Sequence, residues 1–198
     1  MKTTITTLTS VVILTCAAHG QTVINGDFED TTGMTDVGIS YVGAIPGWGE
    51  NGEIMKVTEA ASAAISTAAN GDNILDFDLN ATPGSELSID QVISGFIIGG
   101  QYTLNYLAGN RGAAPNSVVS IAGESNTHSF TEQTAFAPAS ITFTATDVNE
   151  TLRIDFVSFN STLKGNFDNF SITQVPEPSS ALLTLLGSFC FITRRRRD

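Results

Sequence analysis

The sequence predicts an all-β protein whose main domain is a sandwich of two antiparallel sheets. Throughout residues 21–175, short runs in which Thr, Val, Ile and Phe alternate with polar residues are separated by Gly, Asn and Pro. This pattern is typical of strands and turns, and helical periodicity is nearly absent from the same region. A domain of about 155 residues can bury a core of its own, and strands alone usually do so by packing two sheets.

Seven strands can be placed in chain order from their alternation. They are expected within residues 74–79, 87–93, 102–106, 119–121, 140–146, 151–159 and 170–172. In the clearest of them, Ile141, Phe143 and Ala145 share one face and threonines occupy the other, as the two-residue period of a strand requires. We expect about eight to ten strands in all, with the alanine-rich residues 59–69 forming a loop.

The first 20 residues resemble a signal peptide. Lys2 is the only charged residue before Asp27, and residues 8–18 form an apolar core. Ala18 and Gly20 then supply small residues at the two positions that a signal peptidase requires. We expect cleavage after Gly20, which makes residues 1–20 an export signal and residues 21–175 the exported body.

The last 23 residues predict a membrane anchor. Residues 181–192 form an apolar run, which is followed by Arg194, Arg195, Arg196 and Arg197. Positive charge at the end of an apolar segment retains that end on the cytoplasmic side. Residues 179–193 are shorter than the roughly 20 residues that cross a bilayer comfortably, so the anchor is expected to be a short transmembrane helix with a transient role.

This tail also resembles a known sorting signal. Pro176, Glu177 and Pro178, the apolar run and the four arginines follow the order of the PEP-CTERM tail of bacterial exported proteins. The resemblance implies recognition by an exosortase-type membrane enzyme, cleavage near the Pro-Glu-Pro triplet, and a final place at the cell surface or in the extracellular matrix. The alternative is an ordinary tail anchor with a chance Pro-Glu-Pro triplet.

The composition of the body restricts its partners. Residues 21–175 carry four basic and 18 acidic residues, which leaves a formal charge of −14. Such a surface argues against nucleic acid, because binding phosphates requires cations. Both cysteines, Cys16 and Cys190, lie outside the body, so the body forms no disulfide.

The order of several short motifs resembles the galactose-binding-like jelly rolls, which include many carbohydrate-binding modules. The body contains NGDFE at residues 25–29, PGW at 46–48 and DNFSI at 168–172. Between them, DNILDFDL at 72–79, TPGS at 82–85 and LAGN at 107–110 are similar to the choice-of-anchor C type of surface protein. The resemblance implies a jelly-roll sandwich for nearly all of the body.

The resemblance also implies a structural calcium ion, held between the first and last strands by Glu29 and Asp168. Asp27 and Asp76 could add further oxygens. Asp168 shares strand parity with Phe170, which predicts a carboxylate on the core face, where an unpaired charge is costly. A cation that prefers oxygen ligands would relieve that cost. The alternative is that Asp168 reaches solvent at the strand end and binds nothing.

Three residues are candidates for ligand contact. Trp48 and Tyr41 could offer aromatic platforms to a sugar ring, and Arg111 follows a strand and could face a ligand from a loop. For Trp48, packing beneath the loop after the first strand is the favoured alternative. The body has no thiol and one imidazole, that of His128, which is expected in an exposed turn. No nucleophile and base can therefore be paired by motif, and we expect no enzyme activity.

The sequence as a whole predicts an exported, noncatalytic surface protein that binds or structures extracellular polysaccharide. Two alternatives remain open. One is a purely structural or adhesive surface protein without a glycan site, and the other is a hydrolase.

Overall fold

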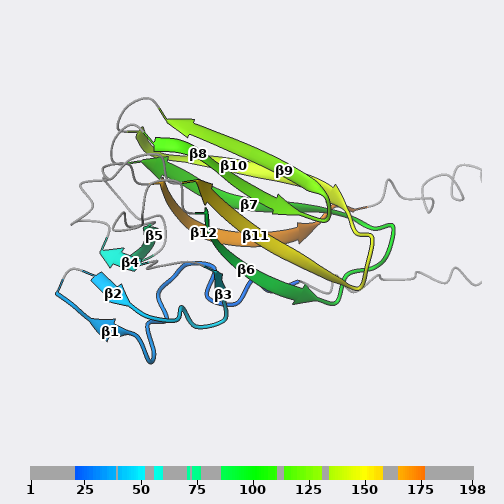
Figure 1. Cartoon of the computed structure of the whole chain (residues 1–198). Coiled ribbons are helices and arrows are strands. Elements are labelled where there is room, and N and C mark those ends of the chain that lie inside the picture. The colour runs from blue at the N-terminus through cyan, green and yellow to red at the C-terminus, as the bar shows by residue number, and fades with distance from the viewer. Residues whose placement is uncertain are drawn as a thin grey trace, which may run out of the picture.

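A computed structural model shows a β sandwich (Figure 1). The structure describes residues 21–38, 40–51, 56–59, 71, 73–76, 86–110, 114–130, 134–157 and 165–176. Within these ranges there are twelve strands and no helix, and the strands form two sheets in which every pair is antiparallel.

The larger sheet has seven strands in the order β1-β2-β4-β5-β12-β7-β10. Their bounds are Thr35–Asp36 (β1), Ser40–Val42 (β2), Lys56–Glu59 (β4), Asn73–Asp76 (β5), Gly165–Gln174 (β12), Gln101–Asn110 (β7) and Thr134–Thr144 (β10). The long strands β12, β7 and β10 lie side by side, and their registers place Asn105 of β7 opposite Ser140 on one side and Ser171 on the other.

The smaller sheet has five strands in the order β3-β6-β11-β8-β9. Their bounds are Gly49–Asn51 (β3), Glu86–Ser94 (β6), Asn149–Val157 (β11), Ala114–Ile121 (β8) and Glu124–Phe130 (β9). From β5 to β8 and again from β9 to β12, successive strands alternate between the two sheets, so the core is built from inward-facing residues of distant segments.

The core lies between the sheets and follows the predicted alternation. Tyr102, Leu104 and Tyr106 of β7 face Leu152, Ile154 and Phe156 of β11, and all six are at most 2% exposed. Burial of side chains of this size stabilises the fold by about 1.5–3 kcal/mol each relative to exposure. The two-sheet antiparallel sandwich expected from the sequence is confirmed.

All seven strands placed from the sequence are present, but the described residues contain twelve strands rather than the expected eight to ten, and five of the twelve had not been placed. Strands β1 to β4 have only two to four residues each, which is too short for alternation to be visible. Strand β9 was missed because its polar sequence resembles a turn. The expectation that His128 occupies an exposed turn is wrong, because it lies within β9 and donates or accepts a 2.7 Å hydrogen bond with the Tyr106 hydroxyl.

The N-terminal segment crosses the larger sheet where β12 carries a bulge. The Gly26 carbonyl accepts a 2.8 Å hydrogen bond from the Phe170 N–H. A Cβ at Gly26 would lie 2.4 Å from the Phe170 carbonyl oxygen, so only glycine allows this approach. Gln91 of β6 holds the same segment, since its side chain bonds to Ile24 N, Ile24 O and Gly47 O.

The two ends of the described chain lie at one end of the sandwich, with the β6–β7 and β10–β11 loops (Figure 1). Gln21 donates a 2.8 Å hydrogen bond to the Gly95 carbonyl, and Val175 donates one of 2.9 Å to the Gln101 carbonyl. The expected signal peptide and all but Pro176 of the expected sorting tail lie outside the described residues. The described part of the chain contains no helix long and apolar enough to cross a membrane.

Candidate functional site

The outer face of the larger sheet is lined by hydroxyl and amide side chains. On β7 the residues that alternate with the core aromatics are Thr103, Asn105 and Leu107, which therefore face outward. The registers extend two of these positions into rows across three strands: Thr142, Thr103 and Thr173 form one row, and Ser140, Asn105 and Ser171 form the next. We call these six residues the polar face.

A shallow depression of about 330 Å³ lies over part of the polar face. It is lined by Asn105, Tyr106, Leu107, Pro138, Ala139, Ser140, Asn169 and Ser171. Two amides and two hydroxyls therefore converge beside the apolar surfaces of Leu107 and Pro138. Uncharged hydrogen-bonding groups next to a small apolar patch match the chemistry of a neutral sugar, which has hydroxyls on its edge and C–H groups on its face.

The polar side chains of this face bind one another only weakly. The Asn105 amide donates to Thr173 Oγ1 and to the Thr103 carbonyl, both at 3.4 Å. Thr103 Oγ1 and Thr142 Oγ1 are also 3.4 Å apart. Because these distances lie at the long end of the hydrogen-bonding range, a ligand hydroxyl could replace such contacts at little cost.

The bulge in β12 brings Asn169 to the rim of the depression. The register of β12 against β7 shifts between Asp168 and Ser171, and Asn169 has a φ of 57°, a conformation that asparagine adopts more readily than most residues. Asp168 Oδ1 accepts a 2.7 Å hydrogen bond from the Asn169 N–H and thereby fixes the bulge. Bulges commonly re-aim side chains beside functional sites.

Aromatic packing beneath the depression holds β7 and β12 together. The rings of Tyr106 and Phe170 stack with centroids 5.1 Å apart and planes 11° apart. Burial raises the pKa of Tyr106 to about 12 and lowers the pKa of His128, its hydrogen-bond partner. Both groups are thus neutral near pH 7, so this aromatic layer carries no charge.

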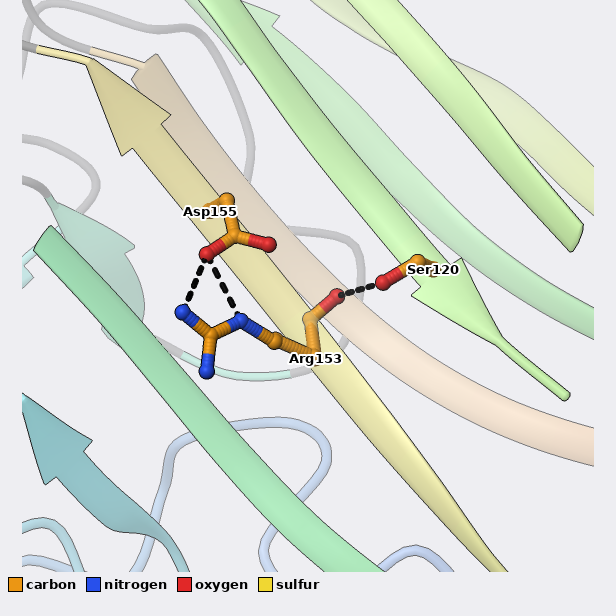
Figure 2. Close-up of polar contacts among 3 residues, drawn as sticks. All are labelled: Ser120, Arg153 and Asp155. Carbon is orange, nitrogen blue, oxygen red and sulfur yellow. Dashed lines mark hydrogen bonds and ion pairs between the residues drawn. The ribbon is translucent and has the colours of Figure 1, made fainter. Parts of the chain in front are cut away.

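The outer face of the smaller sheet is different in character because it is charged. Figure 2 shows Arg153 of β11 beside Asp155, with Nε and Nη2 both 2.7 Å from Asp155 Oδ1. Ser120 of β8 donates to the Arg153 carbonyl at 3.5 Å. The register also places Asp90 of β6 opposite Arg153. The guanidinium is therefore already compensated within the chain, and this face offers a ligand less than the polar face does.

The structure places the three predicted ligand-contact residues away from the depression or outside the described residues. Trp48 is 7% exposed, stacks on Phe28 at 5.6 Å and donates from Nε1 to the Asn25 carbonyl. It belongs to the core and offers no platform to a sugar. Tyr41 is half-buried against the core, and Arg111 lies outside the described residues.

The two carboxylates predicted to bind calcium, those of Glu29 and Asp168, both accept hydrogen bonds within the chain. Both carboxylate oxygens of Glu29 accept hydrogen bonds from Asn73, one from its N–H at 2.9 Å and one from its side chain at 3.2 Å. Asp168 is fully buried, with one oxygen bonded to the Asn169 N–H. Among the described residues, no three His, Cys, Asp or Glu side chains gather as a metal-binding group. The calcium ion stays a prediction.

The strand-parity argument for Asp168 is wrong. Because of the bulge, Phe167 and Phe170 both lie in the core, with ring centroids 6.3 Å apart. Asp168 pairs with the outward-facing Leu107, so it is buried on the outer side of the larger sheet. A carboxylate without solvent is still costly there.

Sequence reasoning missed the residues that form the depression. Asn105 could have been found, because the outward positions of β7 follow directly from the predicted core stripe. Asn169 could not, because a bulge breaks the alternation from which its face would be read.

Comparison with known proteins identifies the fold and no family. No protein-family model matches the chain, and no curated protein matches it. Among solved structures, a Stig cyclase of Fischerella sp. TAU, in complex with an indole compound, aligns with a TM-score of 0.65 and 18% identity. The alignment covers 81% of this chain and 99% of the cyclase.

Carbohydrate-binding modules share the same fold. TmCBM61, in complex with β-1,4-galactotriose, aligns with a TM-score of 0.55 and 16% identity, over 78% of this chain and 99% of the module. The enzymatically active domain of a tailspike protein of bacteriophage CBA120 aligns with a TM-score of 0.53 and 13% identity, over 78% of this chain and 21% of that one. At these identities the likeness shows the fold alone, which agrees with a jelly-roll β sandwich.

Proposed function

We propose that the body binds neutral extracellular polysaccharide through the depression on the polar face. The observation that carries this proposal is the convergence of Asn105, Asn169, Ser140 and Ser171 beside an apolar floor. The three strands that carry these residues, β7, β10 and β12, are the longest of the larger sheet, so the site is built on regular secondary structure. The likeness in fold to TmCBM61, solved in complex with β-1,4-galactotriose, also supports a glycan ligand.

The charge of the protein favours neutral over acidic glycans. The body carries 18 acidic and four basic residues, so an anionic chain approaching it is repelled at long range. Amide and hydroxyl groups can both donate to and accept from sugar hydroxyls. A neutral glycan therefore meets no electrostatic barrier at this face.

We further propose that the chain is exported and sorted by its C-terminal segment, and that it is not an enzyme. The signal-peptide pattern, the resemblance to PEP-CTERM tails and the choice-of-anchor C motif order support export to the surface through an exosortase-type system. His128, the single imidazole of the body, is bonded to Tyr106, which supports a noncatalytic role. A calcium ion held by Glu29 and Asp168 would stabilise the fold.

A glycan array followed by titration tests the binding site. Asn105→Ala is expected to remove one neutral hydrogen bond, worth about 1 kcal/mol, and so to raise Kd roughly fivefold. Asn149→Ala is the matched control, because Asn149 is exposed on the other sheet. Uniform absence of binding to neutral and acidic glycans would favour a purely structural surface protein. Equal losses in both variants would contradict this location for the site.

A further inference from the structure

The end of the sandwich that holds both ends of the described chain carries exposed apolar side chains. In the β6–β7 loop, Ile97 and Ile98 are 52% and 63% exposed, and in the β10–β11 loop Val148 is 49% exposed. Figure 1 shows these two loops side by side beyond the strand ends, at the right of the view. We call Ile97, Ile98 and Val148 the apolar end.

Hydrogen bonds join the two loops into one surface. The N–H groups of Gly95 and Phe96 donate to the Val148 carbonyl at 2.9 and 3.2 Å, and Gly99 N–H donates to the Ala145 carbonyl at 2.8 Å. The loops that carry Ile97, Ile98 and Val148 are therefore held together at one end of the sandwich. Single exposed apolar residues scattered over a protein are common, whereas several gathered at one place are a candidate interaction surface.

Contacts with the core fix the β6–β7 loop, so Ile97 and Ile98 cannot fold back into the core. Phe96 is 3% exposed and its ring lies 4.9 Å from Tyr102 and 5.7 Å from Phe143. The Ile97 N–H donates a 2.9 Å hydrogen bond to the Tyr102 hydroxyl. The core position that this loop can fill is thus taken by Phe96, and the following two side chains remain in solvent.

The sequence places the expected membrane anchor close to this surface. Val175 bonds to Gln101 at the start of β7, and exposed Pro176 follows it. The apolar run begins at Ala181, five peptide units after Pro176, and five units extend at most about 18 Å. When that run is inserted in a bilayer, Pro176 is held within this distance of the lipid surface, and the apolar end lies at the same end of the sandwich.

We propose that the apolar end rests on the lipid surface of the membrane in which the tail is anchored, with its isoleucine and valine side chains at the boundary between headgroups and acyl chains. This inference rests on the membrane anchor included in the proposed function. A short tether gives the loops a high effective concentration at the surface, so weak apolar contacts suffice. The lipid is expected to be zwitterionic, because Asp147 is exposed beside Val148 and the body is acidic.

This orientation leaves the glycan site accessible. Strand β7 starts near the apolar end and runs away from it, and Asn105 lies four residues beyond Gln101 along this strand. At a rise of about 3.3 Å per residue, the depression lies at most about 13 Å farther from the lipid than the start of the strand. The polar face would then stand on the side of the sandwich, open to the extracellular polymer.

A fluorescent probe at Ile98 tests the contact. The chain that remains after the expected cleavage, residues 21–198, with Cys190→Ser, carries one new cysteine, either Ile98→Cys or Val37→Cys, labelled with an environment-sensitive dye. Val37 is the matched control because it is 54% exposed and lies by β1, at the opposite end of the sandwich in Figure 1. The protein is reconstituted into dioleoylphosphatidylcholine vesicles, with flotation of the vesicles as the readout of anchoring.

The expected result is a blue shift of the probe at position 98, with quenching by nitroxide lipids, and no change for the probe at position 37. Adding phosphatidylglycerol should reduce the shift. A probe at Val148→Cys should lose its shift when Ile97→Ser and Ile98→Ser are introduced, while the protein still floats.

Different failures have different meanings. If the protein floats but the probes at positions 98 and 37 respond alike, the lipid contact is overturned and the anchor stands. If the protein does not float, the anchor fails and the contact fails with it. A blue shift at position 98 that depends on protein concentration without vesicles would show a second copy covering the apolar end, and would also overturn the proposal.

Discussion

Gln91 is expected to be a critical polar residue of the core, and its replacement gives a sharp test of the fold. Its side chain is 4% exposed and makes three hydrogen bonds: Oε1 accepts from Ile24 N–H at 2.8 Å, and Nε2 donates to the carbonyls of Ile24 at 2.9 Å and Gly47 at 2.8 Å. If the amide were flipped, Nε2 would face the Ile24 N–H and Oε1 would face the two carbonyls, so these contacts determine the amide orientation. Gln91 thereby ties the N-terminal segment and the loop before Trp48 to β6.

Gln91→Met keeps the length of the side chain and removes all three bonds. At about 1 kcal/mol for each net hydrogen bond, the expected loss is about 3 kcal/mol. For a domain of this size, each 1 kcal/mol lowers Tm by about 2–4 °C, so Tm should fall by about 6–12 °C. Chemical denaturation monitored by Trp48 fluorescence gives the free energy of unfolding directly.

Gln101→Met is the matched control, because the Gln101 side chain is exposed at the start of β7. It is expected to change the free energy of unfolding by no more than about 0.5 kcal/mol. If Gln91→Met and Gln101→Met denature at the same midpoint as the unaltered protein, the three bonds do not hold the N-terminal segment, and the reasoning is refuted.

Three further predictions concern the bulge, the buried tyrosine and histidine, and calcium. Gly26→Ala should destabilise the protein by about 2 kcal/mol or more, because the new Cβ would lie 2.4 Å from the Phe170 carbonyl oxygen. Gly49→Ala is the control and should cost little, because its Cβ would meet only the Asp90 side chain, at 3.4 Å. Equal denaturation midpoints for the two variants would contradict this prediction. Burial lowers the pKa of His128 from 6.5, so the free energy of unfolding should be highest above pH 6.5 and should fall as the pH drops through the folded pKa. Burial raises the pKa of Tyr106 from 10.0 to about 12, so the free energy of unfolding should also fall between pH 10 and 12. Tyr106→Phe should remove the alkaline loss, and a loss of the same size in that variant would exclude the tyrosine as its source. If calcium is bound, EGTA should lower Tm and Asp168→Ala should abolish the difference; an unchanged melting curve after chelation would end the calcium prediction.

The sequence predicted the sandwich because its long strands alternate cleanly. Ile141 and Phe143 face inward and the threonines between them face outward, and both positions follow from a period of two. A period of two within the predicted strand at residues 87–93 puts Gln91 on the same face as Leu87 and Ile89, and all three are buried. What alternation shows, however, is which side chains are buried, and a ligand-binding face is defined by those that are not.

The polar strand β9 and the short strands beside the N-terminal segment could not be predicted for a different reason. Strand β9 has Ser, Asn, Thr and His where a core stripe would show apolar residues. His128 lies partly buried because the Tyr106 hydroxyl offers it a partner from β7, and no local pattern reveals a partner 22 residues away. For Trp48, by contrast, packing in the core was the favoured interpretation of the sequence, and its ring contacts with Phe28 and Phe170 agree with that interpretation.

The bulge of β12 joins the fold to the candidate site. Had β12 kept a regular alternation, Phe167 and Phe170 could not both enter the core, and the Tyr106 ring would lose one of its two phenylalanine neighbours. The extra residue restores both contacts, and its cost is a left-handed φ at Asn169 and a buried carboxylate at Asp168. The hydrogen bond from Asn169 N–H to Asp168 offsets part of that cost. Packing in the core therefore dictates where the Asn169 amide emerges, and the depression on the polar face is as rigid as the aromatic cluster beneath it.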